Sequence, residues 1–425
     1  MPPTSSRPAL AAAGVGMVLA ALSLAAVAAA EAGRRRRRLL RELRERRNYN
    51  VTAATDAELR RLRDLKWEAF PEHEIPGQHV SLNGQEVALR PGLTLTPYAN
   101  AVQCNASCCF CSEELERTDT DGDRTSSKAL PAAGGGPGGY ERYFATLARL
   151  LEELKDLKVG LSLSGLEATA EPNWFRGVME VVAASSTFDE KVLCTNASGF
   201  ADASLVPCLR AASFDRVEVS RQHDDEGMNQ KIMRFGRHVA VRCNDEYAAA
   251  IQRLHGATSC VMNSCLLSQV GISTVEDVER YVAWAASLGI KDIVFREISR
   301  LDSDIFSVNR VASWIESNRV SVDSLLEVIA PSLGSVREGW TYRHSRVGYY
   351  YYNEVYDNRG SHVQLAVPSY AALSSSFSRG VVDKLILWGD LTVTSDWDHR
   401  VHKVASYASP DDAPGAVMHG CAPVW

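Results

Sequence analysis

The sequence lacks an excess of positive charge. Its 46 Lys and Arg residues stand against 52 Asp and Glu residues, and the formal net charge is −6. Proteins that bind nucleic acid generally present a basic face, so this balance argues against a nucleic-acid partner. We also find no internal repeat of solenoid period, which excludes a repeat array. The 425 residues, of which 45% are hydrophobic, suffice for one large globular domain with extensions or for two domains.

Cysteine is sparse outside one stretch. The chain has 10 Cys in 425 residues, too low a density for the disulfide framework of a small secreted protein. Four of them fall between Cys104 and Cys111. No matching C-x2-C or H-x3-H pair follows, as zinc held by two separated ligand pairs would require, and the spacing of Cys260 and Cys265 is unusual for zinc. Zinc ligands and core or disulfide cysteines are therefore the weaker alternatives, and the dense cluster suits a metal site in a reducing compartment.

The N-terminal region, residues 1–47, has an unusual composition. Residues 8–30 carry no charge, and Arg34 to Arg38 follow them. Three interpretations compete: a membrane anchor with the arginines in the cytoplasm, a signal peptide, and an Ala/Arg-rich extension. The positive charge follows the apolar run, which argues against a signal peptide, and alanine is only weakly favourable in a bilayer. We favour the extension and a cytoplasmic protein, with membrane contact only if residues 8–30 anchor the chain.

The stretch after the first apolar strand reads Cys104-Asn-Ala-Ser-Cys108-Cys109-Phe110-Cys111. A [4Fe–4S] cluster is held by Cys thiolates. Three closely spaced thiolates, Cys104, Cys108 and Cys111, would leave one iron open to another ligand. Cys109 is then a spare thiol that packs beside the cluster. The C-x3-C-x2-C spacing, with Phe110 before the last Cys, resembles the signature of the radical S-adenosylmethionine enzymes.

Strand and helix patterns alternate after this stretch, which predicts parallel βαβ units curled into a partial barrel. We therefore expect an α/β fold, a partial (β/α)6 TIM-like barrel over residues 93–300, preceded by a segment at 48–92 and followed by an α+β cap at 301–425. We expect the cap to cover one end of the barrel. The predicted strands are Leu93–Tyr98, Val159–Ser164, Lys191–Thr195, Asp215–Ser220, Ser259–Leu267 and Lys291–Arg296.

Polar residues follow several predicted strands, where ligand sites of parallel barrels form. Gly165-Leu166-Glu167 resembles the family's Gly-Gly-Glu segment, which contacts the amino group of S-adenosylmethionine; Leu166 departs from that pattern. Ser220 and Arg221 match a position that the family uses for the ribose and the carboxylate. A turn with a surface Glu is the alternative for the first segment.

Further candidates follow the later positions. His223 and Asp224 are candidate catalytic groups facing a substrate, and a hydrogen-bonded loop histidine is the alternative. Asn263, Arg296 and Glu297 echo the end of the barrel in the molybdopterin-precursor cyclase branch, as candidates for adenine or substrate contacts. A structural Arg–Glu pair is the alternative. Cys421 is the only Cys after Cys265, so we expect a core without the Cys-rich auxiliary-cluster domain that many members of that branch carry.

The resemblance implies an enzyme whose [4Fe–4S] cluster reductively cleaves S-adenosylmethionine to a 5′-deoxyadenosyl radical. That radical would take hydrogen from a small polar metabolite such as a sugar, nucleoside or amino acid, in specialised metabolism. An external one-electron donor of flavodoxin or ferredoxin type would reduce the cluster. A radical S-adenosylmethionine enzyme that modifies peptides is one alternative, and a zinc-binding interaction or regulatory protein is another.

Overall fold

The computed structural model describes residues 48–65, 77–99, 101–116, 139–301, 306–348, 351–368, 382–397 and 399–408. The chain divides into two compact units, residues 1–49 with 72–75 and residues 50–71 with 76–425, and the account below concerns the second. The predicted extension or anchor at residues 1–47 lies outside the described residues. Within the ranges given above, no helix is both long and apolar enough to span a bilayer.

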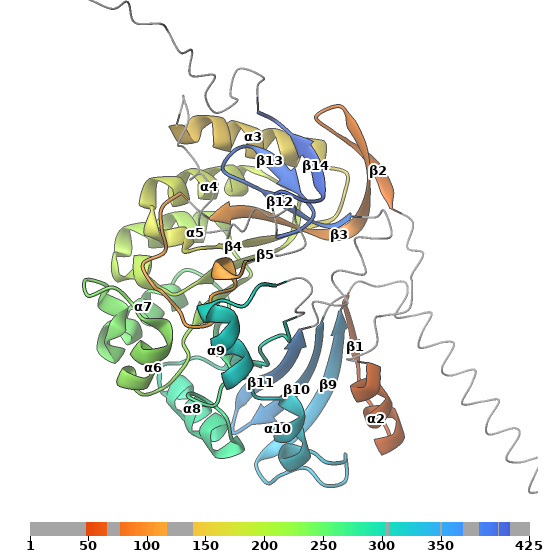
Figure 1. The fold of residues 1–425 in the computed structure, drawn as a ribbon, viewed down its shortest axis with the longest axis vertical. Coiled ribbons are helices and arrows are strands. Elements are labelled where there is room, and N and C mark those ends of the chain that lie inside the picture. The colour runs from red at the N-terminus through yellow and green to blue at the C-terminus, as the bar shows by residue number, and fades with distance from the viewer. Residues whose placement is uncertain are drawn as a thin grey trace, which may run out of the picture. The chain divides into compact units, whose positions relative to one another are not determined.

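Six parallel strands form the centre of one sheet, and the predicted α/β partial barrel is confirmed. They pair in sequence order, each parallel to the next. The sheet curls into part of a barrel (Figure 1). These strands are β3 (Gln85–Ala99), β4 (Val159–Gly165), β5 (Phe188–Thr195), β6 (Arg216–Ser220), β7 (Val261–Leu266) and β8 (Asp292–Arg296).

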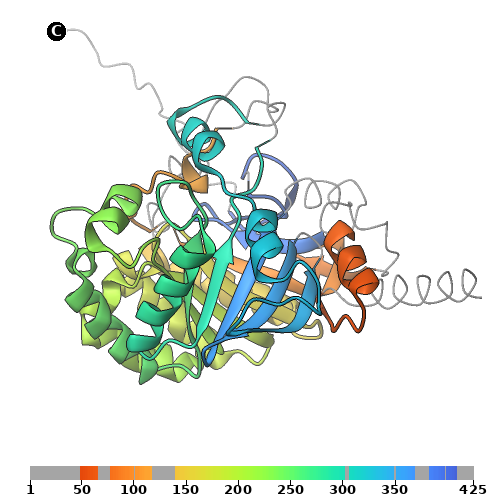
Figure 2. The same ribbon diagram turned by 90° about the horizontal axis from the view of Figure 1, so that it is seen from below.

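Helices between these strands cover the outer face of the sheet (Figure 2). The apolar residues of each strand alternate, so one face of the sheet carries Leu161, Leu193, Val217 and Phe295, all buried against the helices. α8 begins at Val275, because Thr274 and Asp277 form a capping box there. These helices are α3 (Gly139–Glu153), α4 (Pro172–Ala184), α5 (Val206–Ala212), α6 (Glu226–Met233), α7 (Asn244–His255) and α8 (Val275–Ser287).

The C-terminal part extends both edges of the sheet. β11 (Ser361–Pro368) pairs in parallel with β8, and β12 (Val382–Leu387) pairs in parallel with β3. The exposed hydrogen-bonding groups of each edge strand are satisfied in this way. The expected α+β content of this part is present. Its other elements are α9 (Arg310–Asn318), α10 (Val322–Ile329), β9 (Trp340–Gly348), β10 (Tyr351–Asn358), β13 (Thr392–Thr394) and β14 (Lys403–Ser406).

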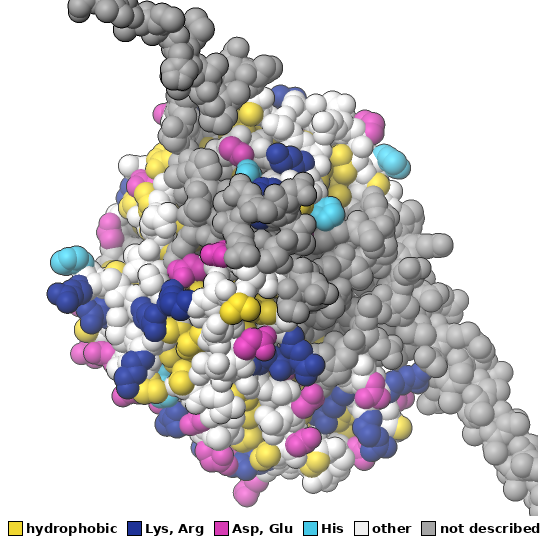
Figure 3. Space-filling model, viewed as in Figure 1, with side chains coloured by type: hydrophobic (Ala, Val, Ile, Leu, Met, Phe, Trp, Pro, Cys, Tyr) yellow, Lys and Arg dark blue, Asp and Glu magenta, His cyan; other side chains and the backbone are white. Residues whose placement is uncertain are grey.

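The elements before the barrel are β1 (Asn48–Val51), α2 (Asp56–Leu65) and β2 (Gln78–Leu82). β2 pairs antiparallel with β3, and α2 contacts the C-terminal part. Arg63 of α2 forms a two-pronged ion pair with the buried Glu354 of β10, with N–O distances of 2.6 and 2.8 Å. Side chains of both charges are interspersed over the described surface seen in Figure 3.

Candidate functional site

The cysteine loop, residues 101–116, follows the carboxyl end of β3 and is fastened to the end of α6. The backbone N–H of Cys109 donates to Ile232 O at 2.9 Å, and that of Ser107 donates to Arg234 O at 3.2 Å. In return, Gly236 N–H donates to Asn105 O at 3.0 Å. The loop therefore has a fixed backbone path across the carboxyl ends of the parallel strands.

The four thiols of this loop fall into two environments. Cys109 is 3% exposed, and its Sγ donates to Lys231 O at 3.5 Å. Cys104, Cys108 and Cys111 are half-buried. The side chain of Cys109 is thus turned into the protein, and the other three thiols keep the C-x3-C-x2-C spacing. Within the described ranges, no three His, Cys, Asp or Glu side chains converge as a metal-binding group in this structure.

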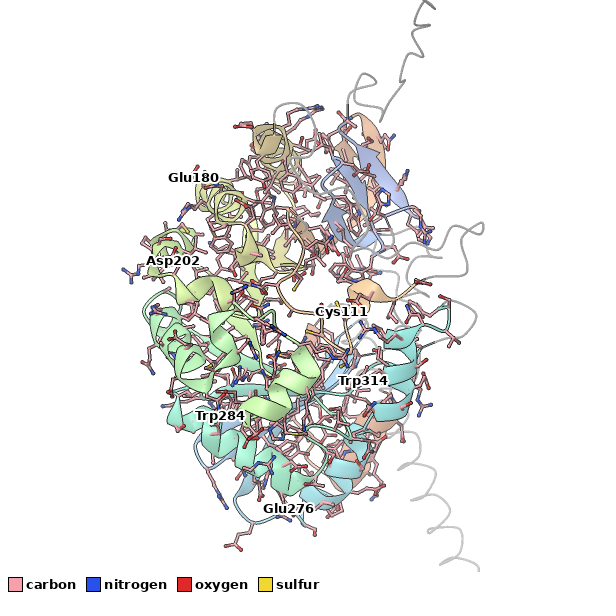
Figure 4. All side chains as sticks on the ribbon, turned by 60° about the vertical axis from the view of Figure 1, so that its left-hand side comes forward. Cys111, Glu180, Asp202, Glu276, Trp284 and Trp314 are labelled. Carbon is pink, nitrogen blue, oxygen red and sulfur yellow. The ribbon has the colours of Figure 1, made fainter. Side chains whose placement is uncertain are left out.

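Phe110 lies at the edge of this loop and packs on the C-terminal part of the chain. Its ring centroid is 6.2 Å from that of Trp314 on α9. Both rings border a small apolar cluster that contains Leu115 and Ile315. Cys111 and Trp314 are labelled in Figure 4, where Glu180 marks α4 and Glu276 marks α8. Phe110 therefore anchors the loop to α9.

Gly165 ends β4 beside the end of β3, and the geometry there requires glycine. Its φ is +119°, and a Cβ at this position would lie 2.8 Å from Ala99 N. The next residue, Leu166, donates its N–H to Ala99 O at 2.9 Å. The predicted turn after the second strand is therefore present, with the backbone of Leu166 directed to β3.

Glu167 is buried and is surrounded by donors of its own chain. Its Oε1 accepts from Thr169 N at 3.1 Å, from Thr169 Oγ1 at 2.5 Å and from Thr195 Oγ1 at 2.7 Å. Its Oε2 accepts from Asn196 N at 2.7 Å. The Asn196 amide then donates to Asn105 Oδ1 in the cysteine loop at 2.8 Å. Glu167 thus joins the ends of β4 and β5, and this network continues into the cysteine loop.

Arg221 does not present the expected carboxylate-binding fork. It is 0% exposed, and its guanidinium donates to Val241 O at 2.8 Å and to the Asn244 side chain. The same group lies 4.7 Å from the centroid of the Tyr247 ring. Burial lowers the pKa of Arg221. The prediction is corrected: alternation turns this side chain toward α7, away from Ser220, which remains half-buried at the end of β6.

His223 and Asp224 lie in the loop that leads to α6. His223 Nδ1 accepts the N–H of Asp225 at 2.8 Å, and burial lowers the pKa of this histidine. Asp224 Oδ2 accepts from Arg280 Nε of α8 at 3.0 Å. This pattern holds the loop against α8, and it matches the alternative of a hydrogen-bonded loop histidine.

Asn263 points away from the inside of the barrel. It is buried in β7, and its Oδ1 accepts from the hydroxyl of Tyr247 on α7 at 2.7 Å. Residues 261, 263 and 265 share the helix-covered face of the strand, because strand side chains alternate. The expected contact of Asn263 with adenine or substrate is corrected on this ground.

Arg296 and Glu297 do not pair with each other, because neighbouring residues of a strand face opposite sides of the sheet. Glu297 lies on the outer side, where it pairs with Arg319 and accepts the N–H of Val322 at the start of α10, at 2.8 Å. Arg296 lies on the inner side and contacts Glu218 of β6, with a distance of 2.6 Å from Nη2 to Oε2. Arg296 therefore faces the inside of the barrel, and Glu297 anchors α10.

The inner face of the sheet, which we call the lumen face, carries Ser220 and Arg296 together with polar residues that the sequence patterns did not identify. Its polar members on β4 to β8 alternate with the apolar outer residues and are mostly half-buried. Glu218 is buried between Arg216, at 3.0 Å, and Arg296. Val192, Met262 and Val294 on the same face are apolar and buried. The polar members, with Cys194, are Ser162, Ser164, Arg216, Glu218, Ser220, Ser264 and Arg296.

Comparison with known proteins gave structural similarities only. No family model matches the chain, and no curated protein matches it. The chain is similar to SuiB of Streptococcus suis, solved bound to S-adenosylmethionine, with 13% identity and a TM-score of 0.40, over 72% of this chain and 60% of SuiB. It is also similar to HemN of Escherichia coli, a coproporphyrinogen III oxidase described as a radical SAM enzyme. That match has 11% identity and a TM-score of 0.34, over 63% of this chain and 67% of HemN.

Proposed function

We propose that this chain is a radical S-adenosylmethionine enzyme that acts on a small polar molecule inside the barrel. The observation that carries this proposal is the cysteine loop at the carboxyl ends of the strands. Cys109 is turned into the protein, and three half-buried thiols remain, in the C-x3-C-x2-C spacing. Ligand sites of parallel barrels form at that end.

The donor set fits a [4Fe–4S] cluster by its chemistry. Cys104, Cys108 and Cys111 would hold three irons through thiolates. The loop that carries them is fixed by backbone hydrogen bonds to the end of α6, so little ordering would remain to be done on binding. The burial and hydrogen bond of Cys109 set it apart from the ligands.

S-adenosylmethionine would lie next to this loop, along the ends of β4 and β6. The backbone at Gly165 and Leu166 and the hydroxyl of Ser220 are the groups we assign to it. Glu167 orders the β4–β5 edge of this site through its bonds to Thr195 and Asn196. When bound, the cluster and S-adenosylmethionine supply the one-electron chemistry that removes hydrogen from a substrate carbon.

The protein's own contribution is to position the substrate and exclude water. The outer residues of the strands are buried against the helices, while the lumen face carries polar side chains on β4 to β8. We infer a small-molecule substrate on the lumen face and an external one-electron donor of flavodoxin or ferredoxin type.

Iron and acid-labile sulfide analysis of anaerobically purified protein, with its visible spectrum, tests the proposal. We expect about four irons and four sulfides per chain and a broad thiolate-to-iron absorption that fades on reduction. Cleavage of S-adenosylmethionine by the reduced protein should follow. Zinc without sulfide would contradict the proposal and favour an interaction or regulatory protein.

A further inference from the structure

The lumen face is accessible where it is lined by β4 to β7. Along each of these strands the residues that face the helices are buried, whereas Ser162, Cys194 and Ser264 on the other face are half-buried. The interior of a closed parallel barrel is normally filled by layers of branched apolar side chains. Here the small side chains of Ser162, Cys194 and Ser264 occupy several of the equivalent positions, beside the buried apolar Met262 and Val294.

A row of three charged side chains, Arg216, Glu218 and Arg296, crosses this face. Arg216 Nε lies 3.0 Å from one oxygen of Glu218, and Arg296 Nη2 lies 2.6 Å from the other. Arg296 starts at the end of β8 and reaches past β7 to Glu218 on β6. Burial alone would raise the pKa of Glu218, but Arg296 and Arg216 outweigh it, so the pKa lies below its usual value. Glu218 is therefore ionised, and it fixes the position of both guanidinium groups.

The two arginines occupy different ends of the lumen face. Arg216 begins β6 and also pairs with Glu190, at 2.8 Å, near the amino ends of the strands. Arg296 is the last residue of β8, at the carboxyl ends, where the cysteine loop lies. Its side chain is 39% exposed although it is bound to Glu218. A solute in the lumen can therefore reach this guanidinium.

Hydroxyl groups surround the approach to Arg296. Ser264 and Ser220 are register partners on β7 and β6, and Leu266 of β7 is the register partner of Arg296. Both serines are half-buried. Serine hydroxyls both donate and accept hydrogen bonds, and a guanidinium recognises planar oxyanions through paired N–H groups.

We propose that the lumen binds a hydroxylated small molecule that carries an oxyanion, with the oxyanion on Arg296 and a hydroxyl on Ser264. This assignment deepens the proposed function, because it names the substrate class of the same site. Glu218 acts as a positioning residue that holds Arg296 in place. A carboxylate and a phosphate would be recognised by the same chemistry, so sugar acids and sugar phosphates both belong to the class.

Calorimetric titration of the full chain with D-gluconate, D-glucose 6-phosphate and D-glucose tests this assignment without using cluster or activity. We expect saturable binding of one or both anionic sugars and at least tenfold weaker binding of glucose. Arg296→Gln should weaken binding of the anion about tenfold, since it removes a charge-assisted contact. Ser264→Leu, which fills the lumen with an apolar side chain, should abolish binding.

Arg337→Gln is the matched control, because Arg337 pairs with Glu279 on the outer surface at 2.9 Å. Arg337 precedes β9, and β10 and β11 lie between β9 and β8 in the sheet. It should leave the affinity unchanged, and thermal unfolding of each variant verifies its fold. Any one of three results would overturn the assignment. These are equal affinity for glucose and gluconate, equal anion affinity in Arg296→Gln and the unmodified chain, and no saturable binding of either anion. Absence of iron and sulfide, with anion binding intact, would instead overturn only the proposed redox function.

Discussion

Oε2 of Glu167 accepts the backbone N–H of Asn196 at 2.7 Å, which ties the end of β4 to the end of β5. The same asparagine contacts Asn105 in the cysteine loop. The Gly-Leu-Glu segment and the cysteine loop, far apart in sequence, are therefore parts of one hydrogen-bonded rim. Thr169, Thr195, Asn105 and Ser198 complete this rim through hydrogen bonds to Glu167 or to Asn196.

Glu167→Gln should destabilise the fold. An amide in place of the carboxylate presents an N–H₂ group to donors that face a carboxylate oxygen in the unmodified chain, so at least one bond of this buried group is lost. We expect the free energy of unfolding to fall by about 1–3 kcal/mol. Urea denaturation followed by circular dichroism measures it.

Glu171→Gln provides the comparison for this variant. Glu171 caps α4 through one bond to Asn173 N at 3.0 Å and is only partly buried. The cost there should be under about 1 kcal/mol. Equal losses in the two variants would show that the rim at Glu167 contributes nothing beyond an ordinary cap.

Cluster assembly should depend on three of the four loop cysteines. Cys104→Ala, Cys108→Ala and Cys111→Ala should each lose the intact cluster, because each removes one thiolate ligand. Cys109→Ala should assemble it, because the Cys109 thiol is buried on Lys231 O. Iron and sulfide content after reconstitution distinguishes the variants, and a full cluster in any of the first three would refute the ligand assignment.

Arg221→Ala should lower stability instead of cofactor affinity. It removes bonds to Val241 O and Asn244 and the contact with the Tyr247 ring, all in the interior. The expected fall in unfolding free energy is about 2–4 kcal/mol. Chemical denaturation measures it, and S-adenosylmethionine titration of the folded protein tests the affinity.

Arg280→Ala is the control for Arg221, because Arg280 is 46% exposed and pairs with Asp224 and Asp277 at the surface. Its cost should not exceed about 1 kcal/mol. A stable Arg221→Ala protein with weakened S-adenosylmethionine binding would restore the carboxylate role that the sequence suggested.

Acidification should destabilise the protein through His223. Burial lowers the pKa of this histidine below the ordinary 6.5, so the unfolded chain takes up a proton first as the pH falls. The stabilisation that the neutral His223 contributes is complete above pH 6.5. It is lost between pH 6.5 and the lower pKa that His223 has in the folded protein, because in that range the unfolded state binds more protons. Each unit of pKa difference corresponds to about 1.4 kcal/mol.

The difference in unfolding free energy between the unmodified chain and His223→Gln, measured from pH 7 to pH 5, isolates this contribution. Glutamine does not titrate, so the unmodified chain should lose more stability than the variant as the pH falls. Parallel curves for the two proteins would show that His223 has no part in the acid response.

The sequence by itself determined the features that are local in the chain. The spacing of Cys104, Cys108 and Cys111 is fixed along one loop, and the periods of apolar residues predicted the six strands and most helices. Gly165 marked a turn because only glycine tolerates that backbone conformation beside Ala99. α6 escaped prediction because it spans only 8 residues and has a weak apolar stripe.

Only the tertiary structure decided which polar side chains meet. Arg221 follows β6 and Asn263 lies in β7, and the ends of both strands suggested a ligand site. The alternation of side chains along each strand turns both residues toward α7. A pair with its neighbour Glu297 was the alternative role considered for Arg296, yet Arg296 contacts Glu218 from a strand 78 residues earlier. The same holds for β11 and β12, which complete the sheet edges. Such pairings depend on register and strand order across the whole sheet, and no local pattern of residues encodes them.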